Sequence, residues 1–431
     1  MRRALLLLAL ACTAPLGAAE PAASAADALA QARKAHQPVL LDFRAPWCYS
    51  CYFMATHVLN GPEWKAVEAK VVVAELDADS PDGAAWMKKL EVKALPAYVV
   101  LNENGEELGR ILAEQPREAF YPKLEKILAG ANTLDGYKRE AAAGSLEAVA
   151  TVLGSYQARG EGRAGLDWYR HLPKAVRDRA GAERATALLL DRLALARAVQ
   201  AKDDAAAVAA AGRVLAGNVG CDRPYVVDQL LEASARLPPP RRAALLAPQK
   251  APLAKLLDEH VFVARPDCAD QRSSVLAAAD LDAALGDAAA EKAVLDRAIE
   301  AAKAGLGGEL GRDRNLADNL RVYLARARRT DELDALYPKL IAAYPDDYVY
   351  AYRYGRSLLE RGQAAAALPL LEQAADKAYG ENRLAVATLR VKALKALHRP
   401  AEAEKVVSEA LEQNGNWFPD EVAKLKAALG A

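Results

Sequence analysis

The first part of the chain is dominated by one stretch, Phe43-Arg44-Ala45-Pro46-Trp47-Cys48-Tyr49-Ser50-Cys51. The apolar run 38–43 predicts a buried strand that leads into it, and the residues after Cys48 predict a helix over 49–59. A cysteine at a helix start lies at the positive end of the helix dipole, which stabilises a thiolate. The spacing therefore predicts a redox pair in which Cys48 attacks a disulfide and Cys51 resolves the mixed disulfide.

Two other uses of this cysteine spacing are a zinc half-site and a purely structural disulfide. A zinc site needs four ligands, and the sequence has neither a second close cysteine pair nor a nearby pair of histidines. His57 alone could supply one further ligand. We therefore favour the redox pair and expect neither a metal nor a cofactor.

Helices and strands alternate around the cysteine pair. The pattern predicts strands over 38–43, 71–76, 97–101 and 108–111, and helices over 25–34, 49–59, 84–90 and 120–128. The Asn104-Gly105 pair between the last two strands is typical of a hairpin turn. This order predicts an α/β domain over residues 20–130, with a mixed sheet flanked by helices.

Three motifs of this region resemble the thioredoxin superfamily: Leu41-Asp42-Phe43 with Ala45-Pro46-Trp47-Cys48, then Ala94-Leu95-Pro96-Ala97, then Asn104-Gly105-Glu106. Residues 47–64 resemble the thioredoxin-like domain of bacterial thiol:disulfide interchange proteins more closely than they resemble cytosolic thioredoxin. The resemblance implies that Pro96 is a cis-proline that faces the cysteines and, with Leu95, holds extended substrate backbone. The alternative is an ordinary trans proline at the start of a strand.

The same resemblance implies that Asp42 is a buried acid beneath the cysteines. A carboxyl group in apolar surroundings has a raised pKa and could take the proton of Cys51 near neutral pH. The alternative is an aspartate that only caps the end of a strand. Many thioredoxins have a lysine near this acid, whereas this chain has Glu75, which would favour protonated Asp42 and oppose thiolate formation.

The remaining residues of the motif have expected roles in substrate binding. Trp47 is expected to pack beside the thiols and shape the docking surface. Tyr49 and Ser50 form the variable pair that tunes the redox potential within the family. We expect His57 to be exposed or to pack, and not to shuttle protons.

The amino terminus resembles a secretory signal over residues 1–19, with a basic start, an apolar run over 4–11 and small residues before a cut after Ala19. Cys12 raises the alternative of a lipoprotein anchor, although the residues before it fit that signal less well. The apolar run is too short to span a membrane, and no later segment is long enough. We expect a periplasmic protein without a membrane span.

Cys221 and Cys268 also remain in the predicted mature chain, both in loop-like sequence at helix ends. Export would place them where disulfides persist, so we favour a structural disulfide between them. A second redox pair and two free thiols stay open as alternatives.

Beyond residue 130 the sequence predicts helices only, with a helical repeat-like region over 131–310 and clearer repeats over 311–431. Small and apolar positions between 351 and 374 recur 36 residues later. This period resembles the tetratricopeptide repeat, which implies a surface that recruits a protein partner. A generic helical bundle is the alternative.

Lys+Arg and Asp+Glu are both 57, so the formal net charge is zero and no nucleic-acid partner is expected. The sequence as a whole predicts an exported thiol:disulfide oxidoreductase acting on protein thiols and disulfides, more plausibly in reduction or interchange than in oxidation. The alternative is a repeat-based adaptor in which the first domain is mainly a docking module.

Overall fold

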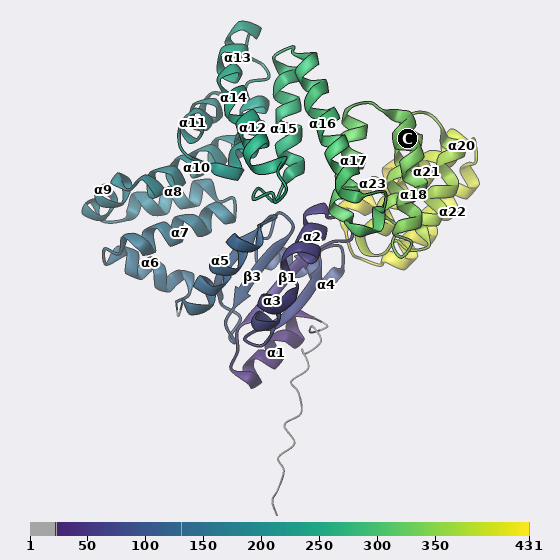
Figure 1. Ribbon diagram of the computed structural model, residues 1–431. Coiled ribbons are helices and arrows are strands. Elements are labelled where there is room, and N and C mark those ends of the chain that lie inside the picture. Colours follow the sequence, from purple (N-terminus) through teal and green to yellow (C-terminus); the bar gives the residue numbers. More distant parts are fainter. Residues whose placement is uncertain (1–21, 23, 131, 431) are drawn as a thin grey trace, which may run out of the picture.

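The computed structural model describes residues 22, 24–130 and 132–430. The predicted signal peptide, including Cys12, lies outside the described residues. An α/β domain comes first and is followed by a long series of helices, as the sequence predicts (Figure 1).

The α/β domain is built on a four-stranded mixed sheet. Its elements are α1 (Ala25–Ala35), β1 (Val39–Arg44), α2 (Tyr49–Phe53), η1 (Met54–Val58), α3 (Gly61–Glu68), β2 (Val72–Asp77), α4 (Pro81–Lys89), β3 (Ala97–Leu101), β4 (Glu107–Leu112) and α5 (Arg117–Ala129). The strand order is β2-β1-β3-β4. Strand β1 is parallel to β2 and antiparallel to β3, so the prediction of a mixed sheet is confirmed.

The central strand β1 is buried on both faces, because successive side chains point to opposite sides of the sheet. Leu41 and Phe43 pack into the cluster that contains α1 residues, whereas Leu40 packs with Met54 and Phe120 on the other side. Asp42 follows the alternation and shares the face of Leu40. It is thereby placed on the side of the sheet that α2 and η1 cover.

The helix after the cysteines differs from its predicted span of 49–59. The α-helical part, α2, ends at Phe53 and continues as a π-helical turn, η1. A further helix, α3, was not predicted, because Val67 is its only buried residue and the apolar periodicity is therefore weak. Helix α4 begins before its predicted start because the hydroxyl of Ser80 accepts a hydrogen bond from the Gly83 N–H at 2.9 Å.

All regular elements in the described residues after β4 are helices. The α-helices that follow α5 are α6 (Leu134–Ala142), α7 (Leu146–Ala158), α8 (Gly162–His171), α9 (Lys174–Ala182), α10 (Arg184–Gln200), α11 (Asp204–Ala216), α12 (Arg223–Ala233), α13 (Pro239–Leu246), α14 (Lys250–Leu256), α15 (Gln271–Ala284), α16 (Ala288–Leu306), α17 (Arg314–Arg326), α18 (Thr330–Ala343), α19 (Val349–Glu360), α20 (Ala364–Ala375), α21 (Gly380–Ala396), α22 (Pro400–Asn414) and α23 (Pro419–Gly430). The prediction of an all-helical second part is confirmed. None of the helices in the described part combines the length and apolar character of a membrane-spanning segment.

Successive helices of this part pack in pairs, for example α19 with α20 and α21 with α22. The period predicted from sequence appears here, since α20 begins at Ala364 and α22 begins 36 residues later at Pro400. Each pair exposes one side, so the pairs must stack on neighbours to bury their apolar faces.

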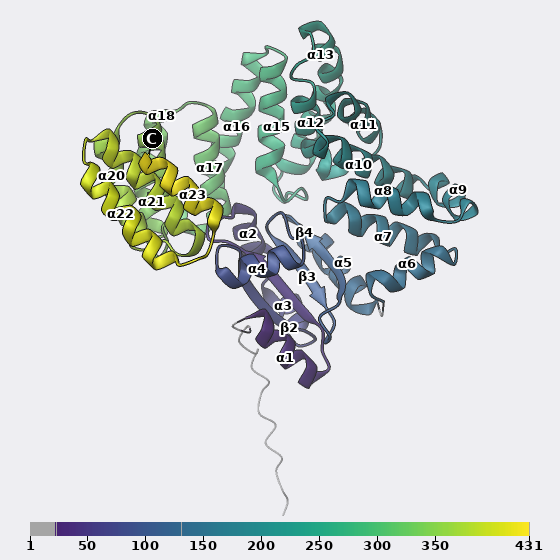
Figure 2. The ribbon, with the colours of Figure 1, turned by 180° about the vertical axis from the view of Figure 1, so that it is seen from behind.

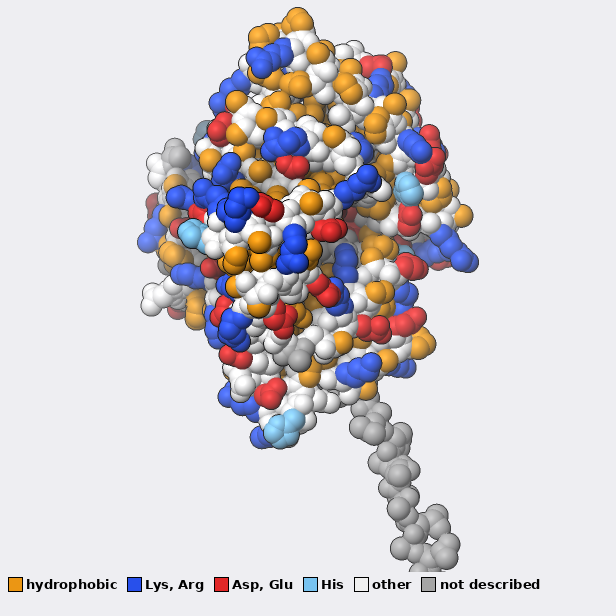
Figure 3. Space-filling view, turned by 90° about the vertical axis from the view of Figure 1, so that its left-hand side faces the viewer, with side chains coloured by type: hydrophobic (Ala, Val, Ile, Leu, Met, Phe, Trp, Pro, Cys, Tyr) orange, Lys and Arg blue, Asp and Glu red, His pale blue; other side chains and the backbone are white. Residues whose placement is uncertain are grey.

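The helical region arcs around the α/β domain (Figures 1 and 2). Helix α7 packs on β4 at one side of the domain, and α17 packs on α2. The end of the sheet at which β1 leads into α2 therefore faces the inside of the arc. On the molecular face shown in Figure 3, basic and acidic side chains are interspersed.

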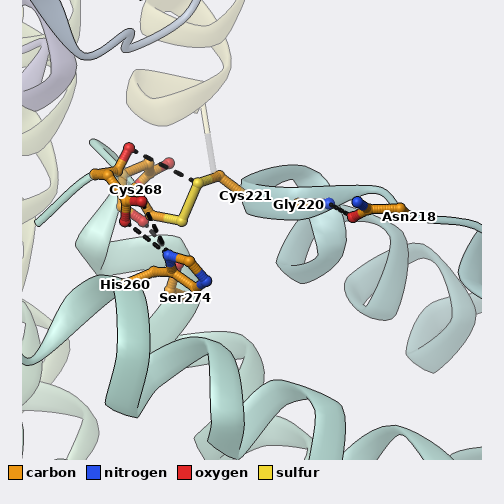
Figure 4. The surroundings of a disulfide bond; sticks show 8 residues. Asn218, Gly220, Cys221, His260, Cys268 and Ser274 are labelled. Atoms are coloured by element: carbon orange, nitrogen blue, oxygen red, sulfur yellow. Dashed lines mark hydrogen bonds and ion pairs between the residues drawn. A yellow bond between two sulfur atoms is a disulfide. The ribbon is translucent and has the colours of Figure 1, made fainter. Parts of the chain in front are cut away.

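A disulfide joins Cys221 to Cys268 within the helical region (Figure 4). Cys221 is exposed in the 3₁₀ turn η2 (Gly220–Asp222), and Cys268 is buried in the loop before α15. The His260 ring lies beside this loop and contacts the carboxylate of Asp267 at 2.9 Å. The bond thus closes a loop of 47 residues in sequence separation.

Removing this disulfide in a Cys221→Ser/Cys268→Ser double variant is expected to lower the free energy of unfolding by about 4 kcal/mol, because the unfolded chain gains loop entropy. Urea denaturation of the oxidised proteins would measure the difference. An unchanged midpoint would show that the bond contributes nothing to stability.

Candidate redox site

Cys48 occupies the N-cap position of α2, directly before its first helical residue. Its sulfur accepts a hydrogen bond from the backbone N–H of Cys51 at 3.1 Å, and the two cysteines form a disulfide. Cys48 is 4% exposed and Cys51 is 8% exposed. The first sulfur therefore lies where a helix start presents N–H groups and positive potential, which stabilise a thiolate.

Asp42 is 3% exposed, and its Oδ1 atom has no hydrogen-bond partner within the described residues. Burial raises the pKa of Asp42 to about 7, with the nearby Arg44 lowering it and Glu75 raising it. Glu75 is paired with Asp42 across β1 and β2, and its carboxylate forms an ion pair with Arg44. The expected influence of Glu75 is present, and Arg44 opposes it.

The peptide bond between Leu95 and Pro96 is cis. Pro96 is buried, and its carbonyl accepts a hydrogen bond from the Ala113 N–H at 2.9 Å. Leu95 packs against a cluster that contains both Cys48 and Cys51. The loop predicted from the resemblance thus lies beside the cysteine pair.

Trp47 is 40% exposed, and its indole N–H donates to the carboxylate of Asp79 at 2.7 Å. This hydrogen bond holds the ring at the rim of the site, in a position compatible with the expected docking surface. Ser50 is buried. Neither observation tests a role in substrate binding, which stays a prediction for both residues.

Glu114 was not singled out from the sequence, yet it is buried next to this site. Neither carboxylate oxygen has a hydrogen-bond partner in the described part of the chain. Burial raises the pKa of Glu114 well above its usual range, and the charge of Asp270 raises it further, while Ser50 and Arg272 lower it. An isolated glutamate in a loop gives no sequence signal of such a position.

Tyr49 is held by three residues of the helical region. Its hydroxyl group is 3.2 Å from Oδ2 of Asp270, and the guanidinium of Arg272 lies 3.6 Å from the centre of its ring. Its backbone carbonyl accepts a hydrogen bond from the Asn315 side chain at 2.8 Å. Burial raises the pKa of Tyr49 to about 12, helped by Asp270, so the phenol remains a donor at neutral pH.

Further contacts join the active-site loop and helix to the helical region. Arg353 of α19 donates to the carbonyl of Trp47 at 2.9 Å. His57 is exposed, as expected, and its Nε2 atom is 2.8 Å from the carboxylate of Asp313. Cys48 is therefore flanked on both sides by residues whose carbonyls bind the helical region.

A buried carboxylate organises these contacts. Asp318 of α17 is fully buried and accepts hydrogen bonds from Arg272 at 2.7 Å, Arg321 at 2.8 Å and Arg353 at 2.6 Å. Burial alone would raise the pKa of Asp318, but the three guanidinium groups hold it well below its usual range. A sequence signal did exist, because Asn315, Asp318 and Asn319 recur at helical spacing on one face of α17.

The predicted site residues fall into two groups. Eight of them lie in the α/β domain. Asp42 lies on the face of β1 that η1 covers, and the other seven form the cysteine pair, adjoin it in sequence or lie in the loop beside it: Trp47, Cys48, Tyr49, Ser50, Cys51, Leu95 and Pro96. Cys221 and Cys268 form a separate disulfide. Asp270, two residues after Cys268, contacts the hydroxyl group of Tyr49 and so links this disulfide to the site. No cluster of three or more metal-ligating side chains occurs in the residues that the structure describes.

The family model of the thioredoxin-like domain matches residues 25–128 of the chain. This match agrees with the geometry of the cysteine pair and the cis-proline loop. Residues 25–128 are a thioredoxin-like domain. The thiol:disulfide interchange protein DsbD of Pectobacterium atrosepticum is 29% identical over 111 residues, which are 25% of this chain and 19% of that protein. DsbD of Cronobacter sakazakii is 32% identical over 105 residues, which are 23% of this chain and 18% of that protein. The chain thus spans about a fifth of the length of these curated relatives.

Two solved structures that are similar to parts of this chain are a thioredoxin and a tetratricopeptide repeat protein. A thioredoxin from Thermus thermophilus is 30% identical, covers 25% of this chain and 88% of its own, and has a TM-score of 0.24. A tetratricopeptide repeat protein from Parabacteroides merdae is 14% identical, covers 66% of this chain and 99% of its own, and has a TM-score of 0.40.

Proposed function

We propose that this protein is an exported thiol:disulfide oxidoreductase that acts on protein thiols and disulfides through Cys48 and Cys51. One observation carries the proposal: Cys48 caps the start of α2 and forms a disulfide with Cys51 inside the thioredoxin-like domain. Pro96 and the buried carboxyl of Asp42 support it, because they supply a neighbouring loop and a proton acceptor.

In the reducing direction, the Cys48 thiolate attacks one sulfur of a substrate disulfide. A mixed disulfide forms, and the other substrate sulfur leaves as a thiolate. Cys51 then loses its proton and attacks the Cys48 sulfur, which releases the second substrate thiolate and forms the Cys48–Cys51 disulfide. Two electrons pass to the substrate, and a second dithiol protein must return them to the pair.

Asp42 is proposed to accept the proton of Cys51 in the resolving step. Its pKa of about 7 lets it exchange a proton at neutral pH, whereas an ordinary aspartate would be too weak a base. The position of Asp42 on the face of β1 that η1 covers supports this role, because η1 directly continues the helix that carries Cys51.

The direction of electron flow is proposed to be reduction or interchange, in a periplasmic location. The names of the DsbD relatives support interchange, and the signal-like amino terminus supports export. The helical repeats are proposed to recruit a protein partner, since stacked helix pairs offer extended binding surfaces. The alternative of an adaptor has support in the packing of α17 on α2 and in the low exposure of both cysteines.

A Cys51→Ala variant separates these two functions. Without the resolving thiol, the mixed disulfide on Cys48 should persist, so incubation of the reduced variant with insulin should give a covalent adduct that dithiothreitol releases. Non-reducing electrophoresis and mass spectrometry of the adduct would identify Cys48 as the attachment site. Absence of any adduct, with the variant folded, would favour the adaptor.

A further inference from the structure

The helical region binds the residues on either side of Cys48. The Arg353 side chain donates a hydrogen bond to the carbonyl of Trp47, and the Asn315 side chain donates one to the carbonyl of Tyr49. Exchange requires a substrate sulfur to approach the Cys48 sulfur closely and in line with the bond that breaks. A protein that delivers its disulfide to Cys48 therefore needs the space next to backbone that the helical region already contacts.

This interface is polar and incompletely packed. Its contacts to Trp47 and Tyr49 include hydrogen bonds and a cation–π contact, and Arg314 lies 4.2 Å from the centre of the Tyr52 ring in α2. A cleft of about 910 Å³ lies beside it, lined among others by His57, Cys268 and Asn315. Interfaces of this character within one chain permit relative motion, unlike large apolar interfaces.

Tyr49 makes the most specific of these contacts. Tyr49 is the first of the two residues between the cysteines, and its ring lies against Arg272 while its hydroxyl group points to Asp270. Arg272 is fixed in turn by Asp318 and Asn319, both at 2.7 Å. A side chain of the redox motif thus enters a binding site that is already organised by the helical region.

Asp270 is held in place by the two segments that the second disulfide joins. The hydroxyl of Tyr225 donates to Oδ2 of Asp270 at 2.6 Å, and Oδ1 accepts from the Ser273 N–H at 2.9 Å. Tyr225 lies one helical turn after Cys221, and Asp270 lies two residues after Cys268. The Cys221–Cys268 bond therefore joins the segment that carries Tyr225 to the loop that carries Asp270, the acceptor that Tyr49 uses.

We propose that Tyr49 is a specificity-determining latch: bound by Asp270, Arg272 and Asn315, it holds the helical region closed over Cys48 and disfavours bulky protein disulfides relative to small ones. The proposal rests on the proposed thiol:disulfide exchange and adds a selection by size. Small disulfides react in the closed form, and proteins react in proportion to the fraction of open molecules.

The test compares Tyr49→Phe with wild type and with Tyr169→Phe. The first variant loses only the hydroxyl that meets Asp270, and the control loses a hydroxyl that donates to the Arg177 carbonyl at 2.7 Å, within the helical region. Rates with insulin and with glutathione disulfide are measured on the full chain, and their ratio is compared. A change in redox potential alters both rates and cancels in the ratio.

Tyr49→Phe is expected to raise the insulin-to-glutathione ratio about fivefold, as loss of one hydrogen bond shifts the closed–open equilibrium. Cys221→Ser/Cys268→Ser should raise it too, because Asp270 loses its support, whereas Tyr169→Phe should leave the ratio at the wild-type value. An unchanged ratio in both latch variants would overturn the proposal while leaving the proposed function intact.

Amide hydrogen exchange tests, independently of activity, whether Tyr49 holds the interface closed. In the oxidised Tyr49→Phe variant, exchange should accelerate over 49–53 and over 266–275, on both sides of the interface, and not in Tyr169→Phe. If wild type reduces neither substrate, the proposed function fails. Equal exchange in all three proteins would then reject the latch as well.

Discussion

A Cys48→Ser variant is expected to reduce insulin more slowly than wild type by more than about a thousandfold, because serine supplies no thiolate at neutral pH. The substitution replaces one sulfur atom with oxygen at the N-cap of α2. Serine is itself a favoured N-cap residue, so the helix start should be preserved. Turbidity from precipitating insulin B chain, with dithiothreitol as the electron donor, measures the rate.

The matched control is the Cys221→Ser/Cys268→Ser double variant, which removes the other disulfide of the described chain and keeps the Cys48–Cys51 pair. It should reduce insulin at least as fast as wild type. Equal rates for Cys48→Ser and wild type would reject the assignment of Cys48 as the attacking thiol.

An Asp42→Asn variant is expected to be more stable than wild type by about 4 kcal/mol at pH 8 and by roughly 2 kcal/mol at pH 5. The pKa of Asp42 is about 7 in the folded chain and 3.8 as a reference value. Between these values the folded protein retains a proton that the unfolded chain releases, so the aspartate destabilises increasingly as pH rises. Asparagine has the same shape and does not ionise.

Urea denaturation of both oxidised proteins at pH 5 and pH 8 measures this difference. The same substitution should slow resolution of the mixed disulfide about a hundredfold and remove its rise with pH near 7, since the proton acceptor of Cys51 is lost. A stability difference that does not change with pH would show that Asp42 does not titrate in this range.

The sequence predicted the first domain well, because its signals are local. The run 97–101 is a fully buried strand, and the order of strands and helices follows from apolar runs and turn residues. Helix α3 was missed because its residues are mostly exposed, and the π-helical turn was missed because its residues have ordinary helical character. Periodicity does not distinguish a wider turn from an α-helix.

The cysteine pair, Asp42 and Pro96 could be placed from short motifs, whereas their partners from the helical region could not. Asp270, Arg272 and Asn315 lie more than 200 residues from Tyr49 in the sequence, and only the packing of the two regions brings them together. The prediction that Tyr49 tunes the redox potential did not include this contact, for the same reason.

The buried carboxylate of Asp318 bears on how the helices α15, α17 and α19 are aligned with one another. Replacing a buried ion cluster by apolar side chains is often neutral or stabilising, so the net strength of such a cluster is not its main effect. Its three arginines come from α15, α17 and α19, and each must meet the same carboxylate. A displacement by one helical turn would leave several charges unpaired and buried. We therefore expect the pairs of Asp318 with Arg272 and Arg353 to favour one register among α15, α17 and α19, in which Arg272 lies against the Tyr49 ring and Arg353 donates to the Trp47 carbonyl.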